Sequence, residues 1–289
     1  MFSIVGIVVV IGAILGGYLM EHGNLKVLIQ PAELIIIGGA GLGTLLIANP
    51  LPVVIGLLKS AAGAFKPSKY SKERYLTALK MLNELFRKAR KEGLSSLEND
   101  VEEPENSEFF KKYPEILKNH HTLHFICDTL RTAMAGTVSH FDLDQLIELD
   151  LDVHHKEVSQ PVTALSSVAD SLPGLGIVAA VLGIVITMSA LGGPPEELGR
   201  KVAAALVGTF LGILLCYGFM SPLAASMNHV NEAESHYYHC LRTGLIAFIR
   251  GAAPILAVEF SRRTIPSAVR PSFKEMEEAF RAKVESIAA

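Results

Sequence analysis

The sequence predicts an all-α, polytopic membrane protein with four transmembrane helices and a helical cytoplasmic domain. Half of its 289 residues are hydrophobic, and these residues are gathered into blocks. Four blocks contain no Asp, Glu, Lys or Arg: residues 2–20, 34–58, 171–195 and 202–231. Each block is close to the roughly 20 residues that a helix needs to cross a bilayer. The long segment between the second and third blocks shows helical patterns and no strand pattern.

Basic residues near the ends of the blocks predict the orientation of the spans. The first block is expected to be an uncleaved span, because no basic residue precedes it and no A-x-A-like cleavage site follows it. The connection 21–33 holds one basic residue, Lys26, whereas five lie between residues 59 and 74 and eight follow residue 231. We therefore expect both termini and residues 59–170 in the cytoplasm. Arg200 and Lys201 oppose this rule, but an even number of spans places their loop outside.

The predicted domains follow from this topology. Residues 1–58 form spans one and two, residues 59–170 form a cytoplasmic helical domain, and residues 171–231 form spans three and four. The tail, residues 232–289, is expected to pack with the 59–170 domain.

Several helices are predicted within the cytoplasmic part. Hydrophobic residues recur at helical spacing between residues 75 and 89, with Ser71 placed to cap this helix and Gly93 to end it. Another pattern covers residues 122–138, and Asp142 with Gln145 forms a capping box for a further helix. The tail contains a second capping box, formed by Ser272 and Glu275. The helix that it starts carries one apolar stripe: Phe273, Met276, Phe280, Val284 and Ile287.

Opposite charges are segregated into neighbouring stretches of this domain. The polar face of the 75–89 helix is basic, and residues 98–108 are acidic. A charge run is usually a solvated face. Segregation favours a charged docking surface, but does not by itself displace the simpler interpretation.

The motifs of enzymes and of metal sites are incomplete or out of context. Gly174, Gly176 and Ala179 match a dinucleotide-binding fingerprint, yet they lie inside an apolar block with no room for a βαβ unit. Small residues there are better explained by close approach of helices. Histidine pairs at helical spacing lack a third ligand; they are His120, His121 and His124, and His236 and His239 beside Cys240. We expect no enzyme activity, no cofactor, no metal site and no nucleic-acid partner, and three buried free thiols: Cys127, Cys216 and Cys240.

The four charge-free blocks contain no carboxylate, although ion paths through membranes normally use ionisable groups. Two interpretations remain open at this point. Either the protein is a structural membrane scaffold, or a partner supplies the charge.

Four long segments resemble the MotA family of flagellar motor stator proteins. They are DSLPGLGIVAAVLGIV, ELGRKVAAALVGTFLGILLCYGFMSPLA, AVEFSRRTIPSAVRPSFKEMEE and RKARKEGLSSLENDVEEP. The resemblance covers essentially the whole chain. It implies a ring of five copies around two copies of a single-span partner, MotB, which carries the missing carboxylate. It also implies a bacterial inner membrane location and a flagellar function.

The resemblance implies roles for several residues. Pro173 and Pro222 match the family's functional prolines, which couple the partner's protonation to the cytoplasmic domain. We expect Pro173 to start the third span, Asp170 to cap that helix, and Pro222 to kink the fourth. Arg90 and Glu98 match the charges that contact the rotor, a protein resembling FliG.

The same resemblance predicts the transported ion. Sodium-driven members carry a threonine at the position of Ala180, paired with one at the position of Thr209. This chain keeps only Thr209, and Thr187 lies about 10 Å further along the helix at 1.5 Å per residue. Because sodium needs several oxygen ligands, we predict proton transport past Ala180 and Thr209. The alternative function is that of ExbB/TolQ relatives, which energise outer-membrane processes and typically have three spans.

Overall fold

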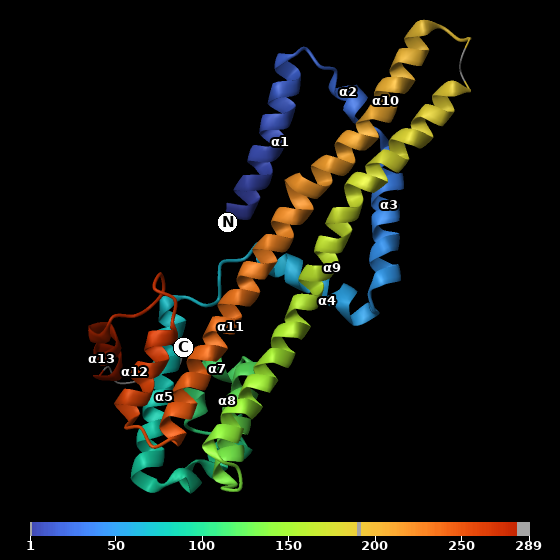
Figure 1. The fold of residues 1–289 in the computed structure, drawn as a ribbon. Coiled ribbons are helices and arrows are strands. Elements are labelled where there is room, and N and C mark those ends of the chain that lie inside the picture. Colours follow the sequence, from blue (N-terminus) through green and yellow to red (C-terminus); the bar gives the residue numbers. More distant parts are fainter. Residues whose placement is uncertain (1, 190–191, 282–289) are drawn as a thin grey trace. The chain divides into compact units, whose positions relative to one another are not determined.

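The computed structural model describes residues 2–189 and 192–281, and every regular element in these ranges is a helix (Figure 1). Four helical stretches are long and apolar enough to cross a membrane: Ser3–Met20, Leu25–Ala48, His140–Met188 and Pro195–Ile249. The predicted fold class, an all-α membrane protein with four spans, is therefore confirmed. The chain divides into a membrane unit, residues 1–67 and 157–231, and a polar unit, residues 68–156 and 232–289.

The membrane unit begins with four helices, of which the second is a single turn. They are α1 (Phe2–Met20), α2 (Leu25–Leu28), α3 (Pro31–Ala48) and α4 (Leu51–Ala64). The charge-free block 34–58 is therefore not one helix. Pro50 disfavours the helical conformation of the residue before it, and Asn49 is extended, with φ −130° and ψ 141°. Its side chain donates to the carbonyl of Leu45 at 3.0 Å, which ends α3.

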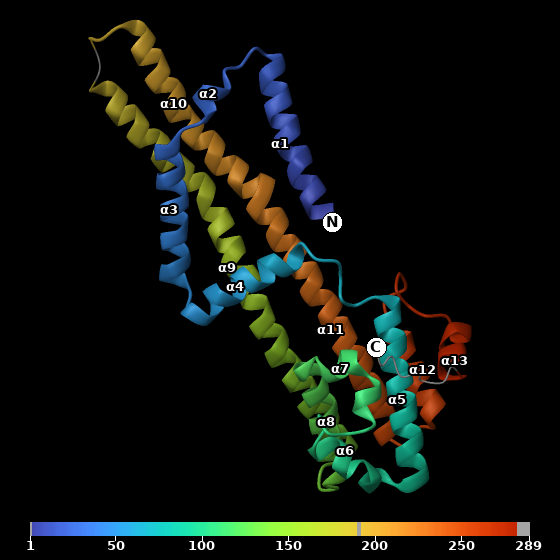
Figure 2. The same ribbon diagram turned by 180° about the vertical axis from the view of Figure 1, so that it is seen from behind.

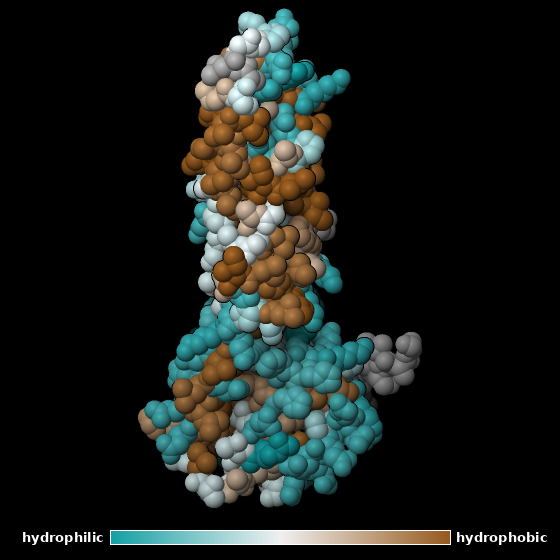
Figure 3. Space-filling model, turned by 90° about the vertical axis from the view of Figure 1, so that its right-hand side faces the viewer, coloured by the Kyte–Doolittle hydropathy of each residue, from teal (hydrophilic) through white to brown (hydrophobic). Residues whose placement is uncertain are grey.

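Two long helical runs complete the membrane unit. The first is α9 (His140–Met188), and the second joins α10 (Pro195–Ile213), the π-helix η3 (Leu214–Met220) and α11 (Ser221–Ile249) without a loop (Figure 2). The space-filling view shows hydrophobic side chains over much of the visible surface of the spans and mainly hydrophilic ones over the polar unit (Figure 3). Apolar side chains facing outward are expected where lipid, rather than water, is the solvent.

The predicted close approach of small residues occurs between α9 and α10. A Cβ built on Gly176 would lie 2.8 Å from the carbonyl oxygen of Gly208 and 3.0 Å from Cα of Gly212. A Cβ built on Gly183 would lie 2.7 Å from Cβ of Ala205. Only residues without side chains, or with a single methyl group, allow the two backbones to approach this closely.

The polar unit has one hydrophobic core. Its helices include α5 (Lys72–Glu92), α8 (His120–Met134), α12 (Pro254–Thr264) and α13 (Phe273–Arg281), with the C-terminal part of α11. Short elements connect them: η1 (Leu94–Leu97), α6 (Glu98–Glu102), η2 (Phe110–Lys112) and α7 (Pro114–Leu117). The rings of Phe86 and Phe248 stack with centroids 4.4 Å apart, which joins α5 to α11.

Most predicted helix ends of this unit are confirmed. Ser71 caps α5 by accepting the N–H of Arg74, and Gly93 follows the helix with φ 88°. The Ser272 and Glu275 capping box is present in both directions, at 3.2 and 2.6 Å. The Asp142 and Gln145 box is wrong, because α9 begins two residues earlier and the Ser139 hydroxyl accepts the N–H of Asp142 instead. Of the tail stripe, Met276 is fully buried, whereas Val284 and Ile287 lie outside the described residues.

Candidate functional sites

The predicted ion-path residues lie where α9 and α10 touch. Ala180 is 7% exposed, and a Cβ built on Gly208 would lie 3.2 Å from the Ala180 nitrogen. Thr209, the next residue of α10, is half-buried. The two residues therefore come from neighbouring positions of two helices in contact, although they are 29 positions apart in the sequence.

The hydroxyl of Thr187 is used within its own helix. It is buried, and it donates to the carbonyl of Gly183 at 2.7 Å. This hydrogen bond uses the proton of the hydroxyl and leaves the oxygen lone pairs free, so only the distance along α9 separates Thr187 from the position of Ala180.

Two structural expectations for the start of the third span are wrong. The helix α9 is continuous from His140 to Met188, with Pro173 in its interior. Asp170 is exposed in the middle of this helix, so it caps nothing. Pro173 has no N–H to give to the carbonyl of Ala169, four residues earlier, and that carbonyl belongs to a fully buried residue. The proline therefore weakens the helix from within instead of starting it.

Pro222 lies inside a continuous helical run, as predicted, and the structure adds how the run accommodates it. Pro222 is the second residue of α11 and follows directly on the π-helix η3. The N–H of Ser221 donates to the carbonyl of Cys216, five residues earlier. Such wide turns are frequent at functional sites and at helix bends. No sequence signal identified this segment.

Glu33 contradicts the conclusion that no carboxylate lies within a span. It is the third residue of α3, within the apolar stretch Leu25–Ala48. It is 7% exposed, and its Oε2 atom has no hydrogen-bond partner in the described part of the chain. The charge-free block begins at residue 34, directly after Glu33, whereas α3 begins three residues earlier, at Pro31. Pro31 at the first helical position was the signal that the helix includes it.

Arg90 and Glu98 are both exposed, on either side of the turn between α5 and α6. Arg90 lies in the last turn of α5, and Glu98 is the first residue of α6. Neither has an ion-pair partner within residues 2–189 and 192–281. Leu97, fully buried beside Glu98, anchors the turn to the core. Arg90 and Glu98 therefore present opposite charges to the solvent, beside the exposed Arg87, Lys91 and Glu92.

Other members of the two charged stretches pair within the chain. Lys88 donates to Asp100 at 2.6 Å, and Asp100 also accepts the hydroxyl of Ser107 at 2.6 Å. Arg131 of α8 donates to Glu102 at 2.8 Å. The segregated charges therefore serve partly as internal contacts, which narrows the surface available for docking.

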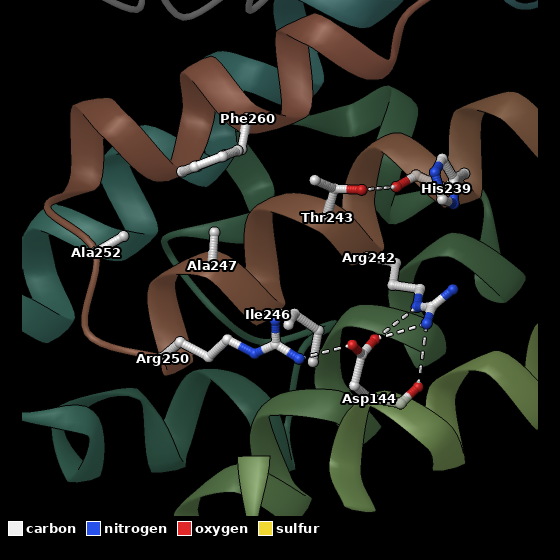
Figure 4. Close-up of a pocket in the computed structure, with 9 residues that line it drawn as sticks. All are labelled: Asp144, His239, Arg242, Thr243, Ile246, Ala247, Arg250, Ala252 and Phe260. Carbon is white, nitrogen blue, oxygen red and sulfur yellow. Dashed lines mark hydrogen bonds and ion pairs between the residues drawn. The ribbon is translucent and has the colours of Figure 1, made fainter. Parts of the chain in front are cut away.

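A cavity of about 400 Å³ lies elsewhere in the polar unit (Figure 4). Arg242 and Arg250 both donate to Asp144, at distances of 2.7–2.9 Å. Burial and, to a lesser extent, the charge of Arg242 lower the pKa of the His239 side chain.

The buried Cys240 thiol donates to the carbonyl of Ser261 at 3.3 Å. No group of three or more His, Cys, Asp or Glu side chains suited to a metal occurs in the described ranges.

Comparisons with known proteins agree with this architecture. Residues 4–93 match the family model described as Motility protein A N-terminal, and residues 117–239 match that of the MotA/TolQ/ExbB proton channel family. The chain is 43% identical over 282 residues to Motility protein A of Salmonella typhimurium, covering 98% of this chain and 96% of the relative. Chemotaxis protein LafT of Vibrio parahaemolyticus is 35% identical over 96% of this chain and 97% of its own length.

Solved structures share the fold. The structure of C. jejuni MotAB superposes with a TM-score of 0.76 at 18% identity, covering 94% of this chain and 98% of that one. The flagellar MotAB stator complex from Bacillus subtilis gives a TM-score of 0.74 at 22% identity, covering 92% and 96%.

Four apolar spans and the matched channel model define the class as a polytopic membrane protein of the MotA/TolQ/ExbB type. The N-terminal model and the relatives that match along their whole length narrow this class. The chain belongs to the motility protein A family.

Proposed function

We propose that this chain is a stator subunit of the bacterial flagellar motor. With a single-span, MotB-like partner it forms an ion channel that couples proton flow to torque on the rotor. The observation that carries the proposal is the 43% identity to a motility protein A over 98% of the chain. The matched N-terminal model, residues 4–93, favours this function over that of ExbB/TolQ relatives.

The proposed assembly is a ring of five copies around two copies of the partner, in the inner membrane with both termini cytoplasmic. Outward-facing apolar side chains support self-association as well as lipid contact. In the membrane unit, α9 exposes Ile177, Val178, Val181, Leu182 and Val185. In the polar unit, the same helix exposes Phe141, Leu146, Leu149 and Val153. Apolar side chains on a polar domain are typical of an interface.

The proposed ion is the proton, carried by the partner's membrane aspartate past Ala180 and Thr209. Its support is the missing hydroxyl at Ala180 and the two helical turns that separate Thr187 from that position. Pro173 and Pro222 then transmit the partner's protonation through α9 and α11. Asp170, exposed on α9 near Pro173, belongs to this proposed coupling segment without acting as a cap.

Arg90 and Glu98 are proposed to contact the rotor protein, which resembles FliG. Reversing either charge should slow rotation without loss of the protein from the membrane, because both side chains are exposed and unpaired within the described chain. Exposed ion pairs are worth about 0–1 kcal/mol each, so we expect alanine variants to be mild and charge reversals stronger. Lys88→Glu breaks an internal pair instead and serves as a control for structural damage.

The test is complementation of a bacterium whose own motility protein A has been deleted, with the chain supplied together with its partner. Swimming should be restored and should persist in sodium-free medium. Arrest without sodium and recovery on its addition would overturn the proton assignment. Failure to restore swimming, together with restored outer-membrane transport in a second strain that lacks its own ExbB/TolQ proteins, would favour the alternative.

A further inference from the structure

Glu33 is a buried carboxyl of the membrane unit that the proposed ion path does not use. Two helices enclose it, in addition to the helix α3 that carries it. A Cβ built on Gly208 of α10 would lie 2.6 Å from Oε2 of Glu33, and one built on Gly183 of α9 would lie 3.7 Å from Oε1. The carboxyl group therefore rests against two glycines, in space that any larger residue at Gly208 would fill. Its burial comes from this chain's own helices.

No cation among the described residues neutralises this carboxyl group. The helix α10, which packs against α3, carries Arg200, Lys201, Glu196 and Glu197. Lys59 lies in α4, which also contacts α3, and Lys26 lies in α2, which packs against α10. Lys201 pairs with Glu197 at 3.0 Å. None of these cations lies within ion-pair distance of Glu33 in residues 2–189 and 192–281. Between Asp170 and Met188, α9 has no acidic, basic or histidine side chain.

The surroundings select a proton as the bound ion. An isolated buried carboxylate is strongly disfavoured, and binding a proton removes its charge. Sodium or a divalent cation would need several oxygen ligands, whereas the carboxyl group of Glu33 lies against Gly183 and Gly208. A single carboxyl group in such a place suits a proton alone.

The position of Glu33 links it to the predicted ion path. Gly208 lies against Oε2 of Glu33, and a Cβ built on Gly208 would also lie 3.2 Å from the Ala180 nitrogen. Thr209 is the next residue of α10. We propose that Glu33 is a proton-binding site of the membrane unit, protonated at rest, that exchanges its proton with the path past Ala180 and Thr209. The exchange rests on the proposed function, whereas the protonated state of Glu33 does not.

The protonated state can be tested on the purified protein in lipid vesicles with the apolar reagent dicyclohexylcarbodiimide. The carboxylic O–H adds across one C=N bond of the reagent, and the adduct rearranges to a stable N-acylurea without a leaving group. Mass spectrometry should find this adduct on the Glu33 peptide, with a yield that falls as pH rises. Glu33→Gln should abolish it. Labelling of Glu33 no greater than that of Glu21, which is exposed, would overturn the proposal.

The exchange can be tested by motor speed as a function of external pH. Glu33→Gln keeps the size of the side chain but cannot carry a proton, so speed should fall and its loss should grow as pH rises. Glu33→Asp should restore part of the response, and the matched control Glu21→Gln should behave as the unchanged chain. A Gln variant that matches the unchanged chain at every pH would reduce Glu33 to neutral packing and refute the exchange. Failure of the unchanged chain to restore motility would refute the proposed function instead, and the labelling result would stand apart from it.

Discussion

Replacing Gly176 with alanine should loosen the crossing of α9 and α10, whereas the same replacement at Gly174 should not. The new Cβ at position 176 would lie 2.8 Å from the Gly208 carbonyl oxygen and 3.0 Å from Cα of Gly212. Both atoms are backbone, so the helices must separate to admit it. Overpacking of this kind costs about 1–3 kcal/mol, which exceeds the roughly 0.5–1 kcal/mol that alanine gains over glycine inside a helix. At Gly174 nothing lies within 4 Å, so only the gain remains.

Three buried thiols provide the assay. Cys216, 1% exposed, belongs to the buried cluster beside this crossing. Cys127 and Cys240 lie in the core of the polar unit, where burial raises the pKa of both thiols to about 12 and keeps them unreactive while folded. Heating with a thiol reagent, followed by mass spectrometry of each cysteine peptide, gives a separate unfolding midpoint for each site.

The expected result is specific to one unit. With a net loss of about 1–2 kcal/mol, and about 2–4 °C for each kcal/mol in a protein of this size, the Cys216 midpoint should fall by roughly 2–8 °C in Gly176→Ala. It should hold or rise in Gly174→Ala. The midpoints of Cys127 and Cys240 should not move in either variant. Equal Cys216 midpoints in the two variants would show that the helices do not touch at Gly176.

Two further predictions concern the proline inside α9 and the ion pair that joins α13 to α5. Pro173→Ala restores an N–H donor for the Ala169 carbonyl, so the Cys216 midpoint should hold or rise while the motor slows; a fall in both would mark Pro173 as a packing residue only. Hydrogen bonds from Lys72, and to a lesser extent from Ser272, lower the pKa of the Glu275 carboxyl from 4.5 to about 2. Because the folded-state pKa is lowered, the stabilisation is present above about pH 4.5 and is lost as pH falls towards 2. The protection of the α13 amides, measured as their hydrogen-exchange rate relative to the intrinsic rate at each pH, should therefore fall across that window. Glu275→Gln should remove this pH dependence, and an unchanged profile would contradict the role of the ion pair.

Features set by local chemistry could be predicted from the sequence. Ser71, Gly93 and the Ser272–Glu275 box act on the backbone within a few residues of themselves, so their pattern alone determines the helix end. The four spans follow equally from length and polarity. The free charges at Arg90 and Glu98 were identified through the family resemblance. The neighbouring ion pair between Lys88 and Asp100 joins residues 12 positions apart, and no local pattern specifies it.

Features that depend on the surroundings could not be predicted in this way. Proline usually ends a helix at the residue before it. Pro173 nevertheless lies within α9. Ala169 and Leu172, which precede it in the same helix, are both buried. Packing around the proline outweighs the lost hydrogen bond. Glu33 could not be assigned to a span for a related reason. A block defined by the absence of charge excludes it, although its carboxyl group is buried against Gly183 and Gly208.

Pro173 and Pro222 have the same consequence for the two long helices. Each leaves a carbonyl without its α-helical donor, at Ala169 and at Gly218, and each does so within a run that continues from the membrane unit into residues of the polar unit. A helix interrupted by a loop would absorb a displacement at that loop, whereas an unbroken helix transmits it. A helix with a weakened turn bends there at low cost and stays rigid elsewhere, and in α9 Pro161 provides a second such turn within the membrane unit. In the function proposed above, protonation beside Ala180 changes the direction of α9 at the turn that Pro173 weakens, without unfolding the helix.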